Sequence, residues 1–583
     1  MTGSVRPHVL REYSLIADGE RGALIGPDGA IAWLCAPRWD SPAVFSGLLG
    51  GQGRYAVSPS DPWYVWGGYY ESGSLIWRSR WVGASRTECR EALAMPADPG
   101  RAVVLRRIEA VDGPARVHVV LDLRAGFGRR RMTGLSHAGG CWSGRSGPIR
   151  FRWSGAVRAR PGADGLAFTL TIPEGGHHDL VLELSDRPFD TGPPDADRAW
   201  AATEEAWAAA VPGCEDLLAT RDARHAYAVL RGLTASSGAM VAAATTSLPE
   251  RMEGGRNYDY RYAWIRDQCY AGLAVAAHGP HPLLGGTVRF LTERILADGP
   301  DLMPAYTVAG QGIPGERRLR LRGYPGGAAR AGNQVTGQFQ LDGLGESLEV
   351  FAAAARLDML DEEHWHAAAT AAEAIGKRWQ EPDAGIWELD NQHWAHSRLA
   401  CVSGLRSLAA AAQGPRGRGH PQAAQWSALA DTVLASLADS VHATGRWQRS
   451  SADPRVDASL LLPVIRGALP ADDPRSRATV RAVADELAED GYVYRFRHDA
   501  RPLHKSEGAF LLCGFWMAQV AHVCGDEVAA GRFFERGRAA CGPAGLYTEE
   551  YDVHQRQLRG NLPQAFVHAG MLECAARLST ARS

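Results

Sequence analysis

The sequence predicts a mainly α protein in which an antiparallel β-sandwich domain precedes a larger helical domain arranged as an α/α toroid. Short β-rich runs punctuated by Gly, Pro and Asp fill the first third of the chain. Near residue 195 the apolar spacing changes to three and four residues, which is the period of a helix. Long loops rich in Gly, Pro, Trp and Tyr separate these helices, as expected where a toroid carries its functional site at one rim.

The β-rich part is expected to occupy residues 1–200. The turn PDGA at 27–30 joins two apolar runs and predicts a hairpin. Alternating or β-rich runs then recur between turns, which favours an antiparallel sandwich. The runs are GALIGPDGAIAWLC at 22–35, RAVVLRRIEAV at 101–111, ARVHVVLDLR at 115–124 and LAFTLTI at 166–172.

The helical part is expected at residues 215–583, after a linker. Pro193 and Pro194 precede an Ala-rich helical segment at 195–213, which suits a helix that follows the first domain. Six later segments carry apolar residues three and four apart. They lie at 335–357, 362–379, 399–412, 423–441, 474–490 and 509–525.

Composition excludes several classes of function. The net charge is −2, whereas a protein that binds nucleic acid usually carries an excess of basic residues. No apolar run reaches the roughly 18 residues of a membrane span, and the first residues lack a signal-peptide core. The 10 scattered cysteines contain no CxxC pair, so we expect free thiols, a cytoplasmic protein, and neither a metal ion nor a cofactor. The oligomeric state stays open, with a homo-oligomer as one option.

Aromatic and charged side chains alternate in the segment at 254–270. A pyranose stacks its C–H faces on aromatic rings, while its hydroxyls need paired donors and acceptors. A salt-bridged helix start with core aromatics would give the same composition. The residues concerned are Arg256, Tyr258, Asp259, Tyr260, Arg261, Tyr262, Trp264, Arg266 and Asp267.

Two further segments each supply a candidate acid. Glu388 follows Trp387 in DAGIWELDNQHW at 383–394, and an adjacent indole favours a protonated carboxyl, as a general acid requires. An ordinary acid in the first turn of a helix is the alternative. In the segment at 545–570, Glu549 and Glu550 stand between tyrosines, although neighbouring acids also occur in solvated turns.

A fourth segment contains Arg495 in GYVYRFRHD and Glu507 in HKSEGAFLLCGFW. Cations at the surface before a buried helix explain this segment better than a binding site does. By itself it therefore does not predict a function.

In this order, the segments resemble glycoside hydrolase family 15, the glucoamylase-like enzymes, and within it the bacterial branch that also contains trehalases. The stretch at 13–50 is similar to the opening of that branch, and GGRNYDYRYAWIRD to its sugar-pocket loop. GIWE is similar to the general-acid loop, VDASLLLPV and EGAFLLCGFW to framework helices, and LYTEEYD with GNLPQAFVH to the general-base segment. The resemblance runs from Tyr13 to Met571.

This resemblance implies an (α/α)6 barrel catalytic domain preceded by the β-sandwich. It also implies inverting exo-attack at the non-reducing end of a substrate, without a cofactor or metal. An inverting pair of carboxyls stands roughly 6.5–9.5 Å apart to admit the attacking water. The residues that match family positions are Glu388 (general acid), Glu549 (general base), Arg266 and Asp267 (hydroxyl clamp), Tyr260, Trp264 and Trp387 (pocket aromatics) and Arg495 (beyond the cleavage point).

The expected function is hydrolysis of short α-glucosides or α-glucans, with α,α-trehalose as the alternative substrate. Leu389 stands where fungal glucoamylases carry a second Glu, so we expect short substrates and little preference for α-1,4 linkages. We expect Glu388 to be protonated and Glu549 to be ionised, because their roles are opposite. A non-catalytic carbohydrate-binding protein and a transferase remain as alternatives outside the hydrolases.

Overall fold

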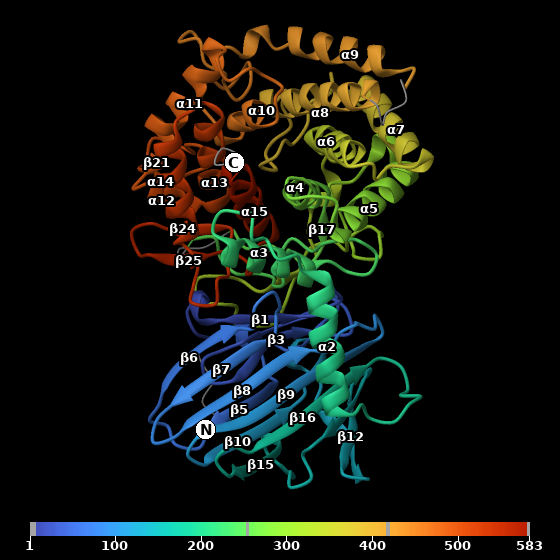
Figure 1. Cartoon of the computed structure of the whole chain (residues 1–583), viewed down its shortest axis with the longest axis vertical. Helices are drawn as coiled ribbons and strands as arrows, with labels where there is room; N and C mark the ends of the chain where they lie inside the picture. The colour runs from blue at the N-terminus through green and yellow to red at the C-terminus, as the bar shows by residue number, and fades with distance from the viewer. Residues whose placement is uncertain (1–6, 252–255, 415–419, 580–583) are drawn as a thin grey trace.

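The computed structural model describes residues 7–251, 256–414 and 420–579. Strands form one body and helices the other, and the two are stacked along the longest axis (Figure 1). Gly254 and Gly255, which open the predicted sugar-pocket segment, lie outside the described residues. No helix among the residues described is long and apolar enough to cross a membrane.

The N-terminal body contains two antiparallel eight-stranded sheets. One has the order β1 (Ser14–Ala17), β2 (Gly22–Ile25), β3 (Ala30–Cys35), β5 (Arg54–Pro59), β10 (Ala115–Asp122), β15 (Gly165–Ile172) and β14 (Arg160–Gly162), and β4 (Ala43–Phe45) pairs with β3. The other has the order β11 (Met132–Ala138), β12 (Cys141–Ser146), β13 (Ile149–Ser154), β16 (His177–Ser185), β9 (Arg101–Asp112), β8 (Arg86–Leu93), β7 (Trp77–Val82) and β6 (Val65–Tyr70).

The predicted hairpin at 27–30 joins β2 to β3. Gly29 has a φ of +69°, and a Cβ there would lie 2.0 Å from the carbonyl oxygen of Val57, so only glycine fits. Strands β10 and β15 alternate buried and exposed residues, as the period of two requires. Trp153 of β13 is buried between the sheets, with its ring centroid 5.8 Å from that of Tyr55 in β5 and 6.0 Å from that of Phe168 in β15.

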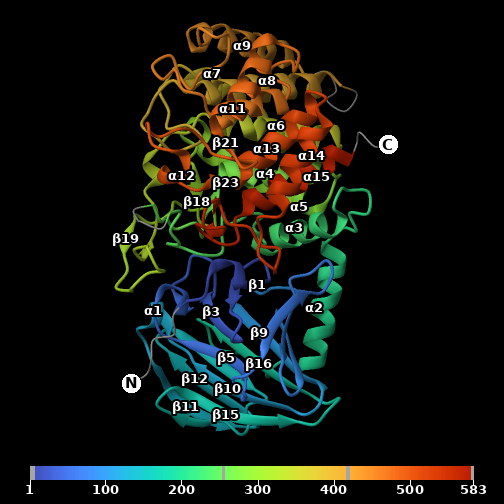
Figure 2. The same cartoon turned by 90° about the vertical axis from the view of Figure 1, so that its left-hand side faces the viewer.

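The helix α2 (Ala196–Ala210) connects the two bodies and runs along the side of the sheets (Figure 2). It packs on β9 and β16. It buries Trp200 and Trp207, and Trp200 donates from Nε1 to Asp179 at 3.2 Å. The division into domains at 1–200 and 215–583 stays a prediction, and α2 is the element on which it depends.

The helical body is a closed double ring, so the predicted fold class is confirmed. Successive contacts join α4 (Ile265–Ala276), α6 (Asp342–Arg356), α8 (Ala395–Gln413), α10 (Leu462–Ile465), α13 (Leu511–Val523) and α15 (Ala565–Ser579), and α15 returns to α4. Outside this ring lie α3 (Thr220–Leu233), α5 (Pro282–Asp298), α7 (Glu362–Arg378), α9 (Ala423–Ala435), α11 (Pro474–Leu487) and α14 (Glu527–Arg538). The inner helix α13 is buried along almost its whole length, whereas the outer α14 buries only one face.

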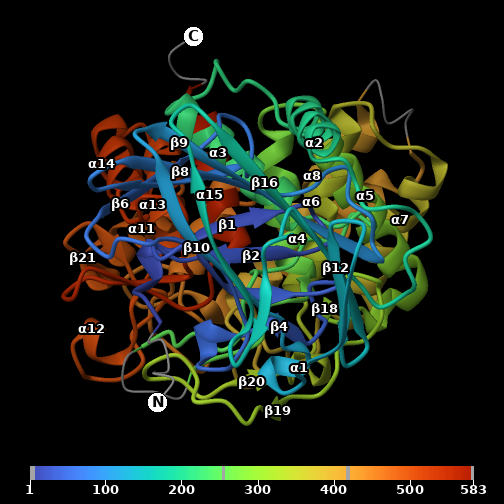
Figure 3. The same ribbon diagram turned by 90° about the horizontal axis from the view of Figure 1, so that it is seen from below.

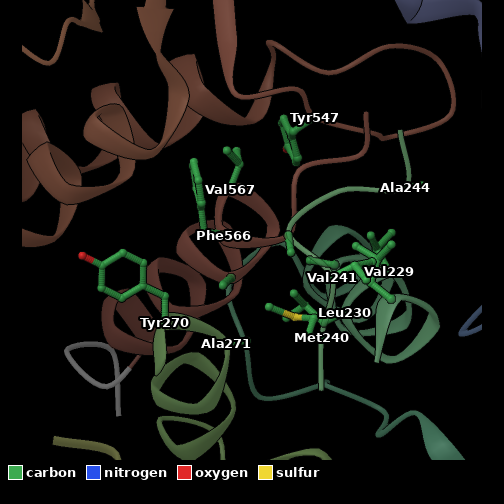
Figure 4. Close-up of a cluster of buried hydrophobic side chains, with 14 of the residues drawn as sticks. Val229, Leu230, Met240, Val241, Ala244, Tyr270, Ala271, Tyr547, Phe566 and Val567 are labelled. Atoms are coloured by element: carbon green, nitrogen blue, oxygen red, sulfur yellow. The ribbon is translucent and has the colours of Figure 1, made fainter. Parts of the chain in front are cut away.

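A hydrophobic cluster fixes the segment that leads to the predicted pocket. Val229 and Leu230 of α3 pack with Met240 and Val241, close to Phe566 of α15 (Figure 4). Beyond this cluster the chain forms backbone hydrogen bonds from Ala242 N to Tyr262 O and from Ala243 N to Tyr260 O, at 2.8 and 2.9 Å. The core therefore holds the pocket segment from behind.

The sheets pack against the side of the helical body, and in the view from below their strands lie in front of the helices (Figure 3). Arg261, which is 1% exposed, projects from the pocket segment into the N-terminal body. It donates to the carbonyl oxygens of Trp39 and Ser41 at 3.2 and 2.9 Å, and it pairs with Asp259 at 2.7 Å. Trp33 donates from Nε1 to the carbonyl oxygen of Ala244 at 3.0 Å. These bonds attach the pocket segment directly to the β-sandwich.

Candidate active site

A cavity of about 420 Å³ opens among the loops at one end of the barrel. The loops precede the inner helices α4, α6, α8, α13 and α15, so residues far apart in sequence meet there. Six of the eight sequence-predicted residues line the cavity, namely Tyr260, Arg266, Trp387, Glu388, Arg495 and Glu549. Trp264 and Asp267 are buried behind this wall, where each contacts a residue that lines it.

Glu388 lies on the wall with 28% of its side chain exposed. Its φ of +55° is unusual for a residue with a side chain, and such backbone strain is concentrated at functional sites. Trp264 donates from Nε1 to Oε1 of Glu388 at 2.8 Å, and a guanidinium nitrogen of Arg266 lies 3.6 Å from the same oxygen. The carboxyl therefore has an N–H donor and a cation as partners.

The environment of Glu388 differs from the one that the sequence suggested. Trp387 directs its Nε1 away, to both carboxylate oxygens of Asp457 at 2.8 and 3.0 Å. Its ring packs against Phe510 and Trp516, with centroids 5.3 and 6.0 Å apart. The indole N–H that bonds to the carboxyl of Glu388 therefore belongs to Trp264 and not to Trp387.

Glu549 is 4% exposed and belongs to a buried group of carboxyls. The phenol oxygen of Tyr260 lies 3.2 Å from both of its oxygens and 3.4 Å from Oε1 of Glu250. Burial raises the pKa of Glu549 well above its usual range, and the nearby Glu250 raises it further, although Arg495 acts in the opposite direction. The direction of this pKa shift is opposite to the one expected for a carboxyl that is readily ionised.

Arg495 interacts with several acids at once, which explains why it does not offset the effect of burial on the pKa of Glu549. It forms ion pairs with Glu507 and, at 3.5 Å, with Glu550. Burial alone would raise the pKa of Glu507, but Arg495 and His498 outweigh burial and lower it to about 2. Glu507 is therefore the permanently charged partner of Arg495.

Sequence reasoning missed Glu250, which is 4% exposed and lines the cavity beside Glu549. Burial raises the pKa of Glu250 as well. Its neighbours in sequence, Pro249 and Arg251, do not form the aromatic pattern that drew attention to the other segments. When two carboxyls far apart in sequence are brought together only by the fold, no pattern in the neighbouring residues indicates that they will be close.

Arg266 and Asp267 lie at different depths. Arg266 lines the cavity and donates to the carbonyl oxygen of Ile386 at 2.7 Å. Asp267 is 1% exposed, lies 3.4 Å from Nε of Arg266, and has a pKa raised by burial to about 6. The pair is therefore a cavity-facing cation with a buried acid behind it.

The more exposed part of the wall is polar. Arg330 forms an ion pair with Glu316, and Arg256 contacts Glu507 at 3.1 Å. The loop between Glu316 and Arg330 is attached to the β-sandwich, because Gly323 N donates to Leu49 O at 3.0 Å and Tyr324 donates to His8 O at 2.9 Å. Alternating charged donors and acceptors suit the hydroxyls of a second sugar ring.

The sequence profile of "Glycosyl hydrolases family 15" matches residues 224–576, which is more than half of the chain. The chain belongs to glycosyl hydrolase family 15. A profile described as "Trehalase-like, N-terminal" matches residues 1–170 of this family 15 protein. The whole chain is 32% identical to a trehalase of Mycolicibacterium smegmatis, over 98% of this chain and 91% of that relative. A trehalase of Mycobacterium tuberculosis is 31% identical, over 98% and 89% of the two chains.

The fold of this family 15 protein matches that of a bacterial glucoamylase solved in complex with acarbose. The TM-score is 0.71 at 14% sequence identity, over 98% of this chain and 94% of that one. At this identity the likeness concerns the fold alone. As a family 15 member the protein is a glycoside hydrolase.

Proposed function

We propose that this family 15 hydrolase cleaves α,α-trehalose with inversion, using Glu388 as general acid and Glu549 as general base. The likeness to two trehalases over 98% of the chain carries the choice of substrate. A cavity of about 420 Å³ lies near the lower end of the 300–1,000 Å³ typical of ligand sites, which suits a disaccharide. This proposal prefers the trehalose alternative to a broader α-glucoside activity.

Glu388 is the proposed proton donor because it is the more exposed of the two carboxyls and stands against two fixed partners. Trp264 and Arg266 hold its Oε1, which leaves its other oxygen to face the bridging oxygen of the substrate. Proton transfer to that bridging oxygen lets the first glucose leave as an alcohol. The other ring then develops oxocarbenium character at its anomeric carbon.

Glu549 is the proposed base. It removes a proton from a water molecule, whose oxygen then bonds to the anomeric carbon from the side opposite the departing glucose. Tyr260 can donate to either oxygen of Glu549 and so favours its ionised form. One trehalose and one water yield two glucose molecules, one released as the β anomer and the other as the α anomer.

The remaining residues position these groups. Arg266 is proposed to bind hydroxyls of the ring that is attacked, while the buried Asp267 holds the guanidinium in place. Trp387 and Phe510 supply apolar surface on the wall. Arg495 is proposed to fix the cluster of acids around Glu549 through its ion pairs with Glu507 and Glu550.

The substrate proposal is tested by incubating the protein separately with trehalose, maltose, isomaltose and soluble starch. Proton NMR taken before mutarotation distinguishes α-glucose from β-glucose. We expect trehalose to be hydrolysed fastest, with equal initial amounts of the two anomers. Faster release of glucose from maltose or isomaltose would overturn the substrate, and α-glucose alone from trehalose would overturn inversion.

We also propose that the protein acts in the cytoplasm. All 10 cysteines are free, and most are buried. Unpaired thiols persist in a reducing compartment, whereas secreted proteins usually pair them.

A further inference from the structure

Three potential metal ligands meet outside the cavity, on one side of the barrel. Glu489 belongs to β21 (Ala488–Glu489), His504 to α12 (Leu503–Ser506), and His554 to the turn between β24 (Glu550–Asp552) and β25 (Gln557–Arg559). These elements lie together at the left-hand edge of the helical body in Figure 1, on the side that faces the viewer in Figure 2. No short motif links the three residues, so the sequence analysis did not find the cluster.

The ligand atoms stand at separations that suit one ion. Oε1 of Glu489 is 3.1 Å from Nε2 of His554 and 3.6 Å from Nδ1 of His504. One ligand atom from each of the three residues lies within 4.8 Å of the other two. Zinc bonds of about 2.0–2.2 Å in a tetrahedral shell place neighbouring ligand atoms roughly 3.4 Å apart. The two imidazole rings are also neighbours, with centroids 3.8 Å apart.

His504 supplies a second observation that points to a ligand. Its Nδ1 is buried and makes no hydrogen bond to any of the described residues. A buried polar atom without a partner is costly, and an ion coordinated by this nitrogen would satisfy it. The side chain of His554, by contrast, is 53% exposed, so an ion can reach the cluster from solvent.

We propose that Glu489, His504 and His554 bind one divalent transition-metal ion of the zinc class, with water completing the shell. Two imidazole nitrogens and one carboxylate oxygen favour zinc, cobalt, nickel or copper over magnesium or calcium, which prefer oxygen ligands. The ion takes no part in hydrolysis, because its ligands lie outside the set of residues that line the cavity.

The position of the cluster indicates a structural role for the ion. Strand β24 begins at Glu550, directly after Glu549, and pairs with β23 (Ala509–Phe510). Strand β23 follows α12 after only two residues, one of which is the Arg495 partner Glu507. An ion that joins α12 to the turn after β24 therefore links both chain segments that hold the acids around Glu549.

Metal binding is tested on the full-length protein after treatment with EDTA and dialysis. Isothermal titration with ZnCl₂ should give one site per chain, and CoCl₂ should give visible absorption of a coordinated cobalt ion. His504→Gln and His554→Gln should each weaken binding at least tenfold. His137→Gln, which changes an exposed histidine of β11 in the β-sandwich, is the matched control and should bind as the wild type does.

Thermal unfolding provides a second readout that does not depend on hydrolysis. Zinc should raise the Tm of the wild type and of His137→Gln, because an ion that binds only the folded state stabilises it. It should not raise the Tm of the double variant of His504 and His554, whose circular dichroism in EDTA shows whether it is folded. No stoichiometric binding to the wild type, or equal binding and equal stabilisation in all variants, would overturn the site. Loss of trehalose hydrolysis alone bears on the proposed function and leaves this result unchanged.

Discussion

The phenol oxygen of Tyr260 lies within 3.4 Å of two buried carboxyls, those of Glu549 and Glu250. A phenol has one proton to donate, so it cannot neutralise the desolvation of both acids at once. Each ionised carboxyl also disfavours ionisation of the other. The two acids therefore titrate as a coupled pair, and Tyr260 influences which of them is ionised.

Replacing Tyr260 with Phe should slow hydrolysis by about 10- to 100-fold, which is the usual range for the loss of one hydrogen bond to a charged group. The missing donor leaves the ionised form of Glu549 less stable, so the pKa of Glu549 rises. The acid limb of the pH–rate profile should then move to higher pH. Tyr258→Phe, at the exposed end of the same wall, serves as control, and an unshifted limb in Tyr260→Phe would contradict the assigned contact.

Replacing Glu250 with Gln should move the acid limb to lower pH. Glu250 is the second cause, after burial, of the raised pKa of Glu549. Removing its charge lowers that pKa, so the base loses its proton at a lower pH and activity begins there. A pH–rate profile of kcat/KM measures the shift, with Glu316→Gln at the cavity mouth as control. A shift toward higher pH would mean that Glu250 is not an anionic neighbour of the base.

Replacing Glu388 or Glu549 with Gln should separate their roles. Loss of a general acid or base costs about 10²–10⁴-fold, so both variants should be nearly inactive on trehalose. Glu388→Gln should retain hydrolysis of α-glucosyl fluoride, because fluoride departs without a proton. Glu549→Gln should release no fluoride, because water has lost its base. A fluoride electrode measures both, and the reverse pattern would exchange the two roles.

Replacing Asp267 with Asn should raise KM and lower kcat on trehalose. The buried carboxylate holds Arg266 by charge at 3.4 Å, and an amide keeps the shape but not the attraction. A guanidinium that is less well held binds the terminal sugar less firmly in the ground state, which raises KM, and loses still more of its contact in the transition state, which lowers kcat. Steady-state kinetics measures both constants, and wild-type values for this variant would remove Asp267 from the site.

The pattern of the sequence was sufficient for the fold because strands and helices depend on local spacing. The residues of the site were harder to predict than the fold, and the segment at 254–270 shows why. Tyr260 and Arg266 reach the cavity, as the sugar-binding interpretation predicted. Asp259 and Arg261, by contrast, form a buried ion pair at the domain boundary, as the structural alternative for this segment had it. Consecutive side chains of an extended segment face opposite sides. The sequence alone does not say which of the two sides faces the cavity and which faces the β-sandwich.

Contacts between distant residues carried no signal in the sequence. Trp264 meets Glu388 across 124 positions, and Tyr260 meets Glu549 across 289. Glu250 and the cluster of Glu489, His504 and His554 were missed for the same reason. The sequence analysis named only Trp387 as the indole beside Glu388, whereas the indole N–H that bonds to this carboxyl belongs to Trp264.

Arg261 makes the catalytic constellation dependent on an intact boundary between the domains. Its side chain is held inside the β-sandwich, while the adjacent Tyr260 contacts Glu549. Any motion that withdraws Arg261 from the carbonyl of Ser41 must displace the phenol from the carboxylate. We therefore expect heat inactivation to begin with separation of the domains, at a temperature where the barrel still keeps its helices. Tighter packing between the sandwich and the barrel would then extend the working lifetime of the enzyme without any change inside its cavity.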